Sequence, residues 1–181
     1  MLWIDFVNSD ARDHLGRGQH EDCLEDPGWL KQFANKWQLR PLKLRSKAQR
    51  DRLRRLRSLL ERWVQSIVGR QPVSPRDIGA LNRYLTAQPV RPQLKADGGS
   101  FSLDLVPSAA GVDAWLFAVA ASFAEFLVDG DHNRLKTCAN ADCMWVFYDT
   151  TRSRTRRWCA VGCGDLIKVR EFRQRQKRRQ R

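Results

Sequence analysis

Two pairs of cysteines near the carboxyl end of the 181-residue chain offer the clearest chemistry in the sequence. Four residues separate Cys138 from Cys143, three separate Cys159 from Cys163, and fifteen lie between the pairs. Each pair can hold one side of a tetrahedral zinc ion, while the intervening loop lets the two sides meet. Because thiolates fill all four positions, no place is left for an activated water. The spacing therefore predicts one structural Zn²⁺, whose removal unfolds this segment.

The other residues that commonly bind metals show no such spacing. Cys23 stands far from the two pairs and is interpreted as a spare thiol in a loop. His14, His20 and His132 have no partners at ligand spacing, so we expect them to be solvated. The alternative that the paired cysteines are scattered core residues is disfavoured, because their Asn, Asp, Gly and Arg neighbours make a poor apolar core.

Charge divides the chain into two parts. It holds 33 Lys and Arg against 20 Asp and Glu, a formal charge of +13. Residues 138–181 contain twelve of the basic residues and four of the acidic ones, so +8 of that charge lies in the last quarter of the chain. The 42% of hydrophobic residues, with seven tryptophans, suffices for a folded core. A basic end on a folded protein favours nucleic acid as the partner.

The first 130 residues are predicted to form a mainly helical α+β domain with one hairpin. Asp26-Pro27 and Ser74-Pro75 each provide an N-cap followed by proline at the first helical position. We predict a short strand or extended segment over 1–9, helices over 27–38, 45–68, 75–87 and 109–128, and a β-hairpin over 94–106. The arginines of the 46–68 helix are expected to form a solvated face rather than a second nucleic-acid surface. A boundary near 129–131 gives the domains 1–130 and 131–181.

The second domain is predicted to be a small treble-clef-like finger. Residues 144–148 can form a strand, and 150–157 a basic turn with Trp158 packed under the metal. Asp165 is expected to cap a basic helix that runs to the end of the chain. Such a helix of about 17 residues extends roughly 25 Å, enough to cross a DNA major groove.

The finger resembles a known family. The run CANADCMWVFYDTTRSRTRRWCAVGCGDLIKVR is similar to the CGNR zinc finger, and IDFVNS near the start resembles the opening L-D-F-V-N-T of the ABATE domain. That domain precedes this finger in stress-responsive bacterial transcription regulators. The resemblance implies that the four paired cysteines bind zinc and that the basic turn and the helix from Lys168 meet nucleic acid. Two departures are Asp165-Leu166 in place of Asn-Arg, and three residues rather than four within the second cysteine pair.

These features predict a zinc-dependent DNA-binding regulator whose N-terminal domain senses a signal or mediates assembly. The expected partner is double-stranded DNA, with RNA or non-specific nucleic-acid binding as the alternative. The final QRQKRRQR is either a disordered tail or an ordered contact. The expected nucleic-acid contacts are Arg152, Arg154, Arg156, Arg157, Lys168, Arg170, Arg173 and Arg175.

Other functions remain as alternatives. Asp5, Asn8 and Ser9 form a polar cluster that is either structural or part of a ligand site, but no motif of catalysis accompanies it, so we expect no enzyme. A small-molecule effector in a tryptophan-lined pocket and a homodimer stay open, although no heptad pattern marks an interface. The longest apolar stretch, 114–127, is interrupted and too short to cross a membrane. Without a secretory signal at the start, the expected location is the cytoplasm.

Overall fold

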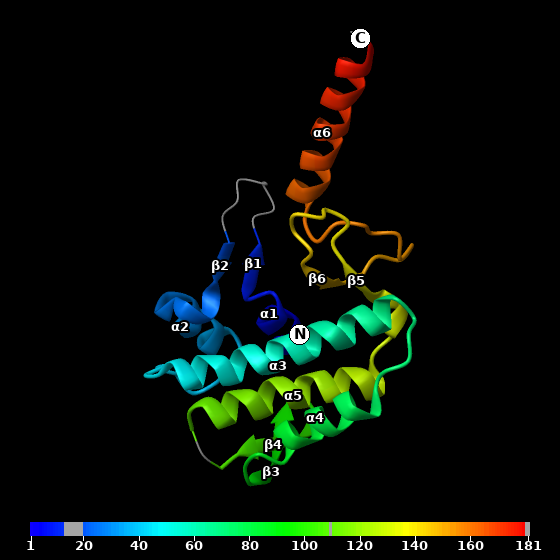
Figure 1. Ribbon diagram of the computed structural model, residues 1–181. Helices are drawn as coiled ribbons and strands as arrows, with labels where there is room; N and C mark the ends of the chain where they lie inside the picture. Colours follow the sequence, from blue (N-terminus) through cyan, green and yellow to red (C-terminus); the bar gives the residue numbers. More distant parts are fainter. Residues whose placement is uncertain (13–19, 109, 180–181) are drawn as a thin grey trace.

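The computed structural model describes residues 1–12, 20–108 and 110–179 (Figure 1). Helices dominate, and three antiparallel two-stranded hairpins accompany them. The helices are α1 (Leu2–Val7), α2 (Pro27–Lys36), α3 (Lys47–Val68), α4 (Pro75–Leu85), α5 (Val112–Asp129) and α6 (Val161–Arg179), with short 3₁₀ turns η1 (Cys23–Glu25) and η2 (His132–Arg134). The strands pair as β1 (Asp10–Arg12) with β2 (His20–Asp22), β3 (Val90–Asp97) with β4 (Ser100–Pro107), and β5 (Leu135–Thr137) with β6 (Val146–Tyr148). The α+β, mainly helical prediction is confirmed.

Two long helices, α3 and α5, form the frame of the helical body, which comprises the described residues up to 130 other than strands β3 and β4 (Figure 1). Ser46 caps α3 by accepting a hydrogen bond from the Gln49 amide at 3.3 Å, and the helix ends at Gly69. Helix α5 is apolar around most of its circumference because α1, α3 and α4 all pack against it. The predicted helical periods of these segments are therefore confirmed.

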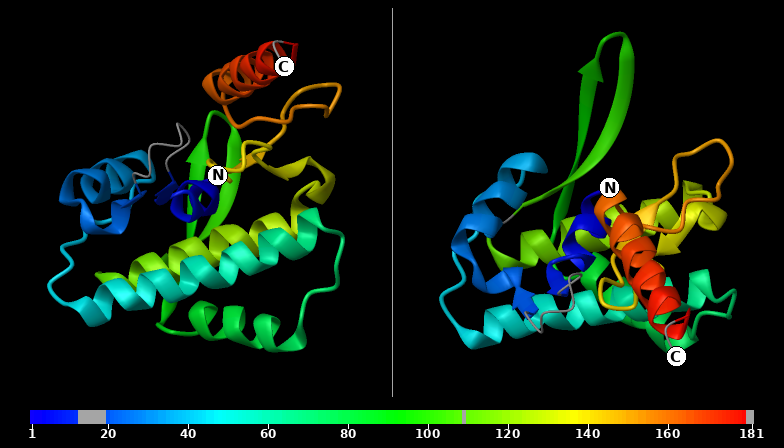
Figure 2. Two further views of the ribbon diagram at one scale, coloured as in Figure 1. Left: turned by 45° about the horizontal axis from the view of Figure 1, so that its top comes forward. Right: turned by 90° about the horizontal axis from the view of Figure 1, so that it is seen from above.

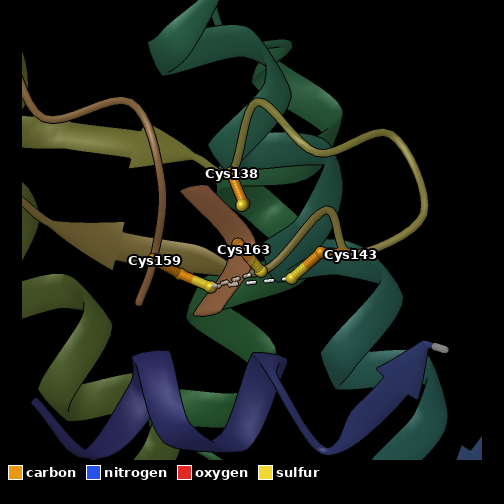
Figure 3. Close-up of side chains that lie close together, drawn as sticks. All are labelled: Cys138, Cys143, Cys159 and Cys163. Atoms are coloured by element: carbon orange, nitrogen blue, oxygen red, sulfur yellow. Dashed lines mark hydrogen bonds between the residues drawn. The ribbon is translucent and has the colours of Figure 1, made fainter. Parts of the chain in front are cut away.

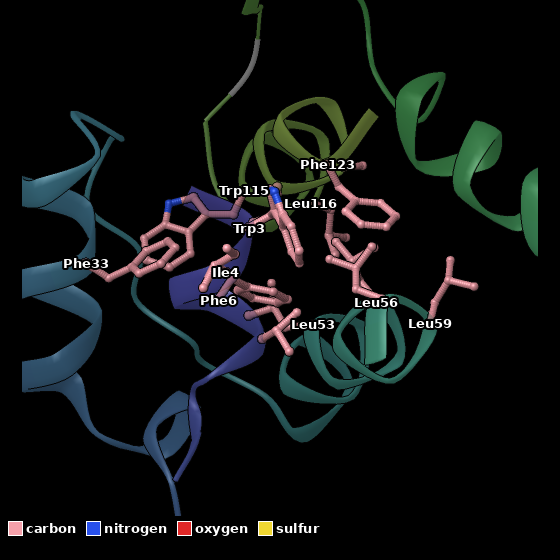
Figure 4. Close-up of a cluster of buried hydrophobic side chains, with 14 of the residues drawn as sticks. Trp3, Ile4, Phe6, Phe33, Leu53, Leu56, Leu59, Trp115, Leu116 and Phe123 are labelled. Atoms are coloured by element: carbon pink, nitrogen blue, oxygen red, sulfur yellow. The ribbon is translucent and has the colours of Figure 1, made fainter. Parts of the chain in front are cut away.

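The core of the helical body is aromatic (Figure 4). The Trp3 ring lies 4.9 Å from that of Phe123, in an edge-to-face arrangement, and Trp63 lies 5.5 Å from Phe123 on another side. Both Trp3 and Phe123 are completely buried. This packing brings the first residues of the chain between the two long helices.

The predicted strand over residues 1–9 is wrong, because residues 2–7 form the helix α1. Trp3, Phe6 and Val7 stand at the i, i+3 and i+4 positions of one helical face, and Ile4 is buried beside them. A short apolar run fits a buried strand and a buried helix equally well, so periodicity alone does not separate the two.

The predicted solvated face of the 46–68 helix is also wrong in part. Arg57 is buried and donates to Asp22 Oδ1 at 2.7 Å and to Ser9 Oγ at 2.9 Å. Arg54 donates from Nε to Asp22 Oδ2 at 2.7 Å. Burial opposes ionisation of Asp22, but the hydrogen bonds from Arg57 and Arg54 outweigh it and lower the pKa of this carboxyl to about 2. The segment β2–η1 covers this side of α3, which a helical period cannot reveal.

The β3–β4 hairpin, called the arm below (residues 90–107), confirms the hairpin prediction and extends it to Val90. Its turn is formed by Gly98 and Gly99, whose φ angles of +53° and +93° suit glycine and match the twist of the strands. The arm projects well clear of the helices (Figure 2).

Strands β5 and β6 begin the finger but share the core of the helical body. Leu135 and Val146 belong to the same buried cluster as the residues of α3 and α5. The Asn8 side chain adds a two-way pairing, since its Nδ2 donates to the Val146 carbonyl and its Oδ1 accepts from the Val146 amide, each at 2.8 Å. Packing therefore continues across the predicted boundary at 129–131. Among the described residues, no helix has both the length and the apolar character that a membrane span needs.

Candidate metal centre and nucleic-acid interface

The four paired cysteines converge on one point (Figure 3). All four Sγ atoms lie within 4.8 Å of one another, with 3.6 Å between Cys143 and Cys159 and 3.8 Å between Cys159 and Cys163. A tetrahedral zinc ion with Zn–S bonds of about 2.3 Å places its sulfurs about 3.8 Å apart. The donor set and its spacing fit one Zn²⁺ and leave no open coordination position for a reacting water.

A tight turn after β5 positions the first cysteine pair. The Cys138 amide donates to the Trp145 carbonyl at 2.8 Å, and the Cys143 amide donates to the Asn140 carbonyl at 2.9 Å. Asn140 is itself buried, and its Oδ1 accepts from the Asp142 amide at 3.1 Å. Its Nδ2 lies 3.9 Å from the Cys163 sulfur, as a donor to a thiolate would. Sequence analysis missed this role, for which the only signal was an Asn inside the cysteine pair.

The close approach of the four sulfurs favours a bound cation. Burial and the neighbouring thiols raise the pKa of Cys159 to about 12, and burial also raises the pKa of Cys143. Four thiolates this close together repel one another, and a divalent ion removes that repulsion while it deprotonates the thiols. None of the five cysteines is in a disulfide. The site is therefore a centre for one structural Zn²⁺.

The second cysteine pair spans the start of α6. The helix begins at Val161, so Cys163 and Gly164 lie in its first turn and Asp165 follows inside it. The prediction that Asp165 caps the helix is therefore wrong: its carboxylate is exposed and lies 3.7 Å from Lys168 Nζ. Trp158 packs against the cysteine cluster as predicted. A Cβ on Gly164 would come within 3.3 Å of the Trp158 ring, so glycine lets the ring lie close to the helix.

One buried carboxylate organises the basic loop, residues 150–157. Asp149 accepts hydrogen bonds from Lys136 Nζ at 2.7 Å and from the amides of Thr151 at 3.0 Å and Arg156 at 2.9 Å. The Lys136 ammonium, followed by the Thr151 bonds, holds the pKa of Asp149 well below its usual range. Lys136 also donates to the carbonyls of Arg154 and Arg156. The sequence analysis did not foresee this arrangement, although Asp149 is part of the run that resembles the CGNR finger.

The four arginines of the basic loop have different environments. Arg152 is exposed, and Arg154 pairs with Asp131 at 3.2 Å while its side chain stays half-exposed. Arg156 turns inward: Nε donates to the Trp158 carbonyl at 2.8 Å, and the guanidinium stacks 5.0 Å from the Phe147 ring centre. Arg157 lies 5.2 Å over the Trp158 ring. Of these four, Arg156 is the one committed most fully to holding the finger together.

Helix α6 leaves the body (Figures 1 and 2), and most of its basic residues are exposed. Lys168, Arg173 and Arg175 are exposed. Arg170 is half-buried and pairs with Asp142 at 2.5 Å, which ties the third turn of the helix to the first cysteine turn. Beyond Arg170, every described side chain of α6 up to residue 178 is exposed. The solvent-exposed surface of α6 is therefore strongly basic.

The polar cluster near the start of the chain is engaged in structural contacts. Asp5 accepts from Trp37 Nε1 at 3.1 Å and pairs with Lys36 at 2.5 Å, while Asn8 pairs with β6 as described. Ser9 is buried against Arg57. Trp145 lines a hollow of about 570 Å³ and Trp63 lines another of about 960 Å³. A smaller hollow of about 360 Å³ is lined by Trp29 and Trp145 together.

The remaining thiol and histidines lie apart from the metal centre. Burial raises the pKa of Cys23, which favours an unreactive thiol. His20 is exposed and lies 2.8 Å from Asp10 Oδ1, and His132 is exposed and lies 3.1 Å from the Leu127 carbonyl. His14 lies outside the described residues.

Comparison with known families agrees with this architecture. The family model ABATE, described as "Putative stress-induced transcription regulator", matches residues 1–130. The chain belongs to the ABATE family. The CGNR zinc finger model matches residues 134–176, which include the four ligands and most of α6. No curated protein matched the chain. Both resemblances drawn from the sequence are therefore confirmed, and the metal centre is that of a CGNR zinc finger.

Proposed function

We propose that this ABATE protein binds double-stranded DNA through α6 and the basic loop, and that it regulates transcription in the cytoplasm of a bacterium. The observation that carries the proposal is the position of α6, which is basic, exposed and fixed at its first turns by the zinc ligand Cys163 and by Arg170. An isolated helix of this kind gains little from packing, so a polyanion is the partner that stabilises it.

The dimensions favour DNA over RNA. The 19 residues of α6 extend about 28 Å at 1.5 Å per residue. A helix fits the B-DNA major groove of about 12 Å width, whereas the major groove of A-form RNA is too narrow for side chains to read. Arg152 on the basic loop would then reach the phosphates beside the groove, and Lys168, Arg173 and Arg175 would line it.

In this proposal the helical body has no catalytic role. Asp5 and Asn8, the polar residues that could have supplied one, are hydrogen-bonded within the fold, and the body holds the finger in place and mediates assembly. The four zinc thiols support a reducing compartment.

The test replaces Arg173 with Gln and measures binding of the zinc-loaded chain to a labelled duplex of about 30 base pairs by fluorescence anisotropy over a salt series. Loss of one phosphate contact lowers the slope of log affinity against log salt by about 0.9. We expect Arg173→Gln to lower that slope by about one and to weaken binding about tenfold near 0.15 M salt.

The matched control is Arg55→Gln, which removes the same charge from an exposed position of α3. It should leave slope and affinity close to those of the wild type. Equal effects of the two variants would place the binding surface elsewhere. If an unlabelled duplex RNA of the same length displaced the labelled DNA as strongly as unlabelled DNA does, the RNA-binding alternative would be supported.

A further inference from the structure

The arm turns its apolar face to solvent. Strand register places Leu94 opposite Leu103, Ala96 opposite Phe101 and Pro92 opposite Leu105, so all six side chains share one face. Leu94 is 67% exposed, Phe101 74%, Leu103 68% and Leu105 53%. Two-stranded hairpins in soluble proteins normally bury their apolar face and solvate the polar one.

At its base, the arm lies against the helical body through the face opposite to these apolar side chains. Asp104, on that face, pairs with Lys95 at 2.6 Å and is only partly exposed. Val106, on the same face, is also only partly exposed, and β4 contacts α5 here. The helical body therefore leaves the apolar face of the arm uncovered.

We infer that the arm is a self-association surface, and that a second copy of this chain covers it, apolar face against apolar face. The inference does not rest on DNA binding. A two-fold arrangement suits a surface that is apolar along its whole length, because the same patch then meets itself.

The exposed area is of the right size for a dimer. At the observed exposures the four large side chains leave on the order of 500 Å² of apolar surface on each copy. A patch of this size is at the upper end of what a monomer exposes and marks an interaction site. Two arms face to face would remove roughly 1,000 Å² from water, which is the lower limit for a specific interface.

Charge also favours a second copy. The arm contains two basic residues, Arg91 and Lys95, and two acidic ones, Asp97 and Asp104, so it is neutral in a chain of +13. It leaves the body on the side away from α6 (Figures 1 and 2). Arms can therefore meet while the basic helices of the two copies stay far apart. A membrane surface is a poorer match, because an apolar face that enters a lipid interface is usually flanked by excess Lys and Arg.

The test measures self-association of the full zinc-loaded chain by sedimentation equilibrium, from about 1 to 300 µM, in about 0.3 M salt to screen the net charge. We expect the wild type to dimerise with a Kd of about 10 µM. Leu103→Glu buries two charges in the proposed interface and should raise that Kd at least about 100-fold. Ser102→Glu adds the same charge at the next residue, on the polar face, and should dimerise like the wild type.

Zinc content and far-UV circular dichroism show that each variant is folded, and Leu94→Glu repeats the test on the other strand. The inference is overturned if the wild type stays monomeric over the whole concentration range. It is also overturned if the wild type, Leu103→Glu and Ser102→Glu dimerise with the same Kd. If the monomer instead floats with phosphatidylglycerol vesicles, a lipid surface covers the arm and the inference is wrong. Because no DNA is present, these outcomes are independent of the proposed regulator function.

Discussion

The helical body and the finger are stabilised by different forces, although strands β5 and β6 of the finger contribute to the hydrophobic core of the body. In the body, aromatic side chains such as Trp3 and Phe123 are completely buried and pack edge to face. Around the metal centre and the basic loop of the finger, the buried side chains are those of Cys138, Cys143, Cys163, Asn140 and Asp149. Dispersion and the hydrophobic effect maintain the body, whereas a metal ion and one carboxylate maintain the finger. A short segment rich in charge can thus be rigid without an apolar core of its own.

Removal of zinc should produce the largest difference in stability between the helical body and the finger. We expect a chelator to unfold residues 138–165 and to release α6, because a structural zinc site contributes on the order of 10 kcal/mol to folding. The body should keep its helices. Hydrogen exchange, followed by mass spectrometry, would show lost protection in the finger while α3 and α5 stay protected.

The control for zinc removal is Cys23→Ser, which should leave the zinc content at one per chain. Cys163→Ser should reproduce the effect of the chelator. If α3 and α5 lost protection as fully as the finger, the two regions would be one cooperative unit, and the contrast drawn above would fail.

The opposite perturbation is Phe123→Ala, which opens a cavity between Trp3 and Trp63. Truncation of a fully buried phenylalanine should lower the free energy of unfolding by about 4 kcal/mol in a urea titration. The zinc content of the folded variant should not change. Phe172→Ala, at an exposed site of α6, is the matched control and should cost less than about 0.5 kcal/mol.

Acid should weaken the contacts of β2 with α3 through Asp22. Its pKa is about 2 in the folded chain and about 3.9 in an unfolded one, so its contribution of about 2 kcal/mol is complete above pH 5 and is lost as the pH falls toward 2. We therefore expect the wild type to lose about 2 kcal/mol more than Asp22→Asn between pH 5 and pH 2.

Thermal unfolding of both proteins over this pH range measures the difference. Acid-induced loss of zinc affects the two proteins alike and cancels in the comparison. Parallel stability curves would mean that the Arg57–Asp22 pair does not hold Asp22 ionised.

The smallest effect is expected at the junction of the two regions. Asn8→Asp keeps the acceptor for the Val146 amide but removes the donor to its carbonyl, which should cost about 1.5 kcal/mol in a urea titration. Asn35→Asp, the same change at an exposed site of α2, should cost only a few tenths. A loss at Asn8 no larger than that at Asn35 would show that the shared core alone joins the regions.

Sequence patterns predicted those features that depend on local spacing. The helices of the body followed from apolar periods and Ser or Asp caps, and the metal centre followed from two short cysteine pairs. The hairpin followed from alternation around Gly98 and Gly99. Each of these signals lies within a few residues of the structure that it specifies.

The features that escaped prediction depend on residues far apart in the chain. Nothing in the sequence near Arg57 indicates that β2 covers it. The helix α1 is not evident from its own residues, because the segments that pack against it, α3, α5 and β6, lie far along the sequence. The interaction of Lys136 with Asp149 crosses thirteen residues and closes a loop that looked merely basic. Such contacts arise only when tertiary packing brings the segments together.

The pairing of Asn8 with β6 bears on how the finger can evolve. The amide contacts only main-chain atoms of Val146, so it places no demand on which side chain occupies that position. Mutations can therefore change the exposed residues of the finger, including those of α6, without loss of this attachment. A lineage could acquire a finger of new specificity by recombination at this junction and retain the same helical body.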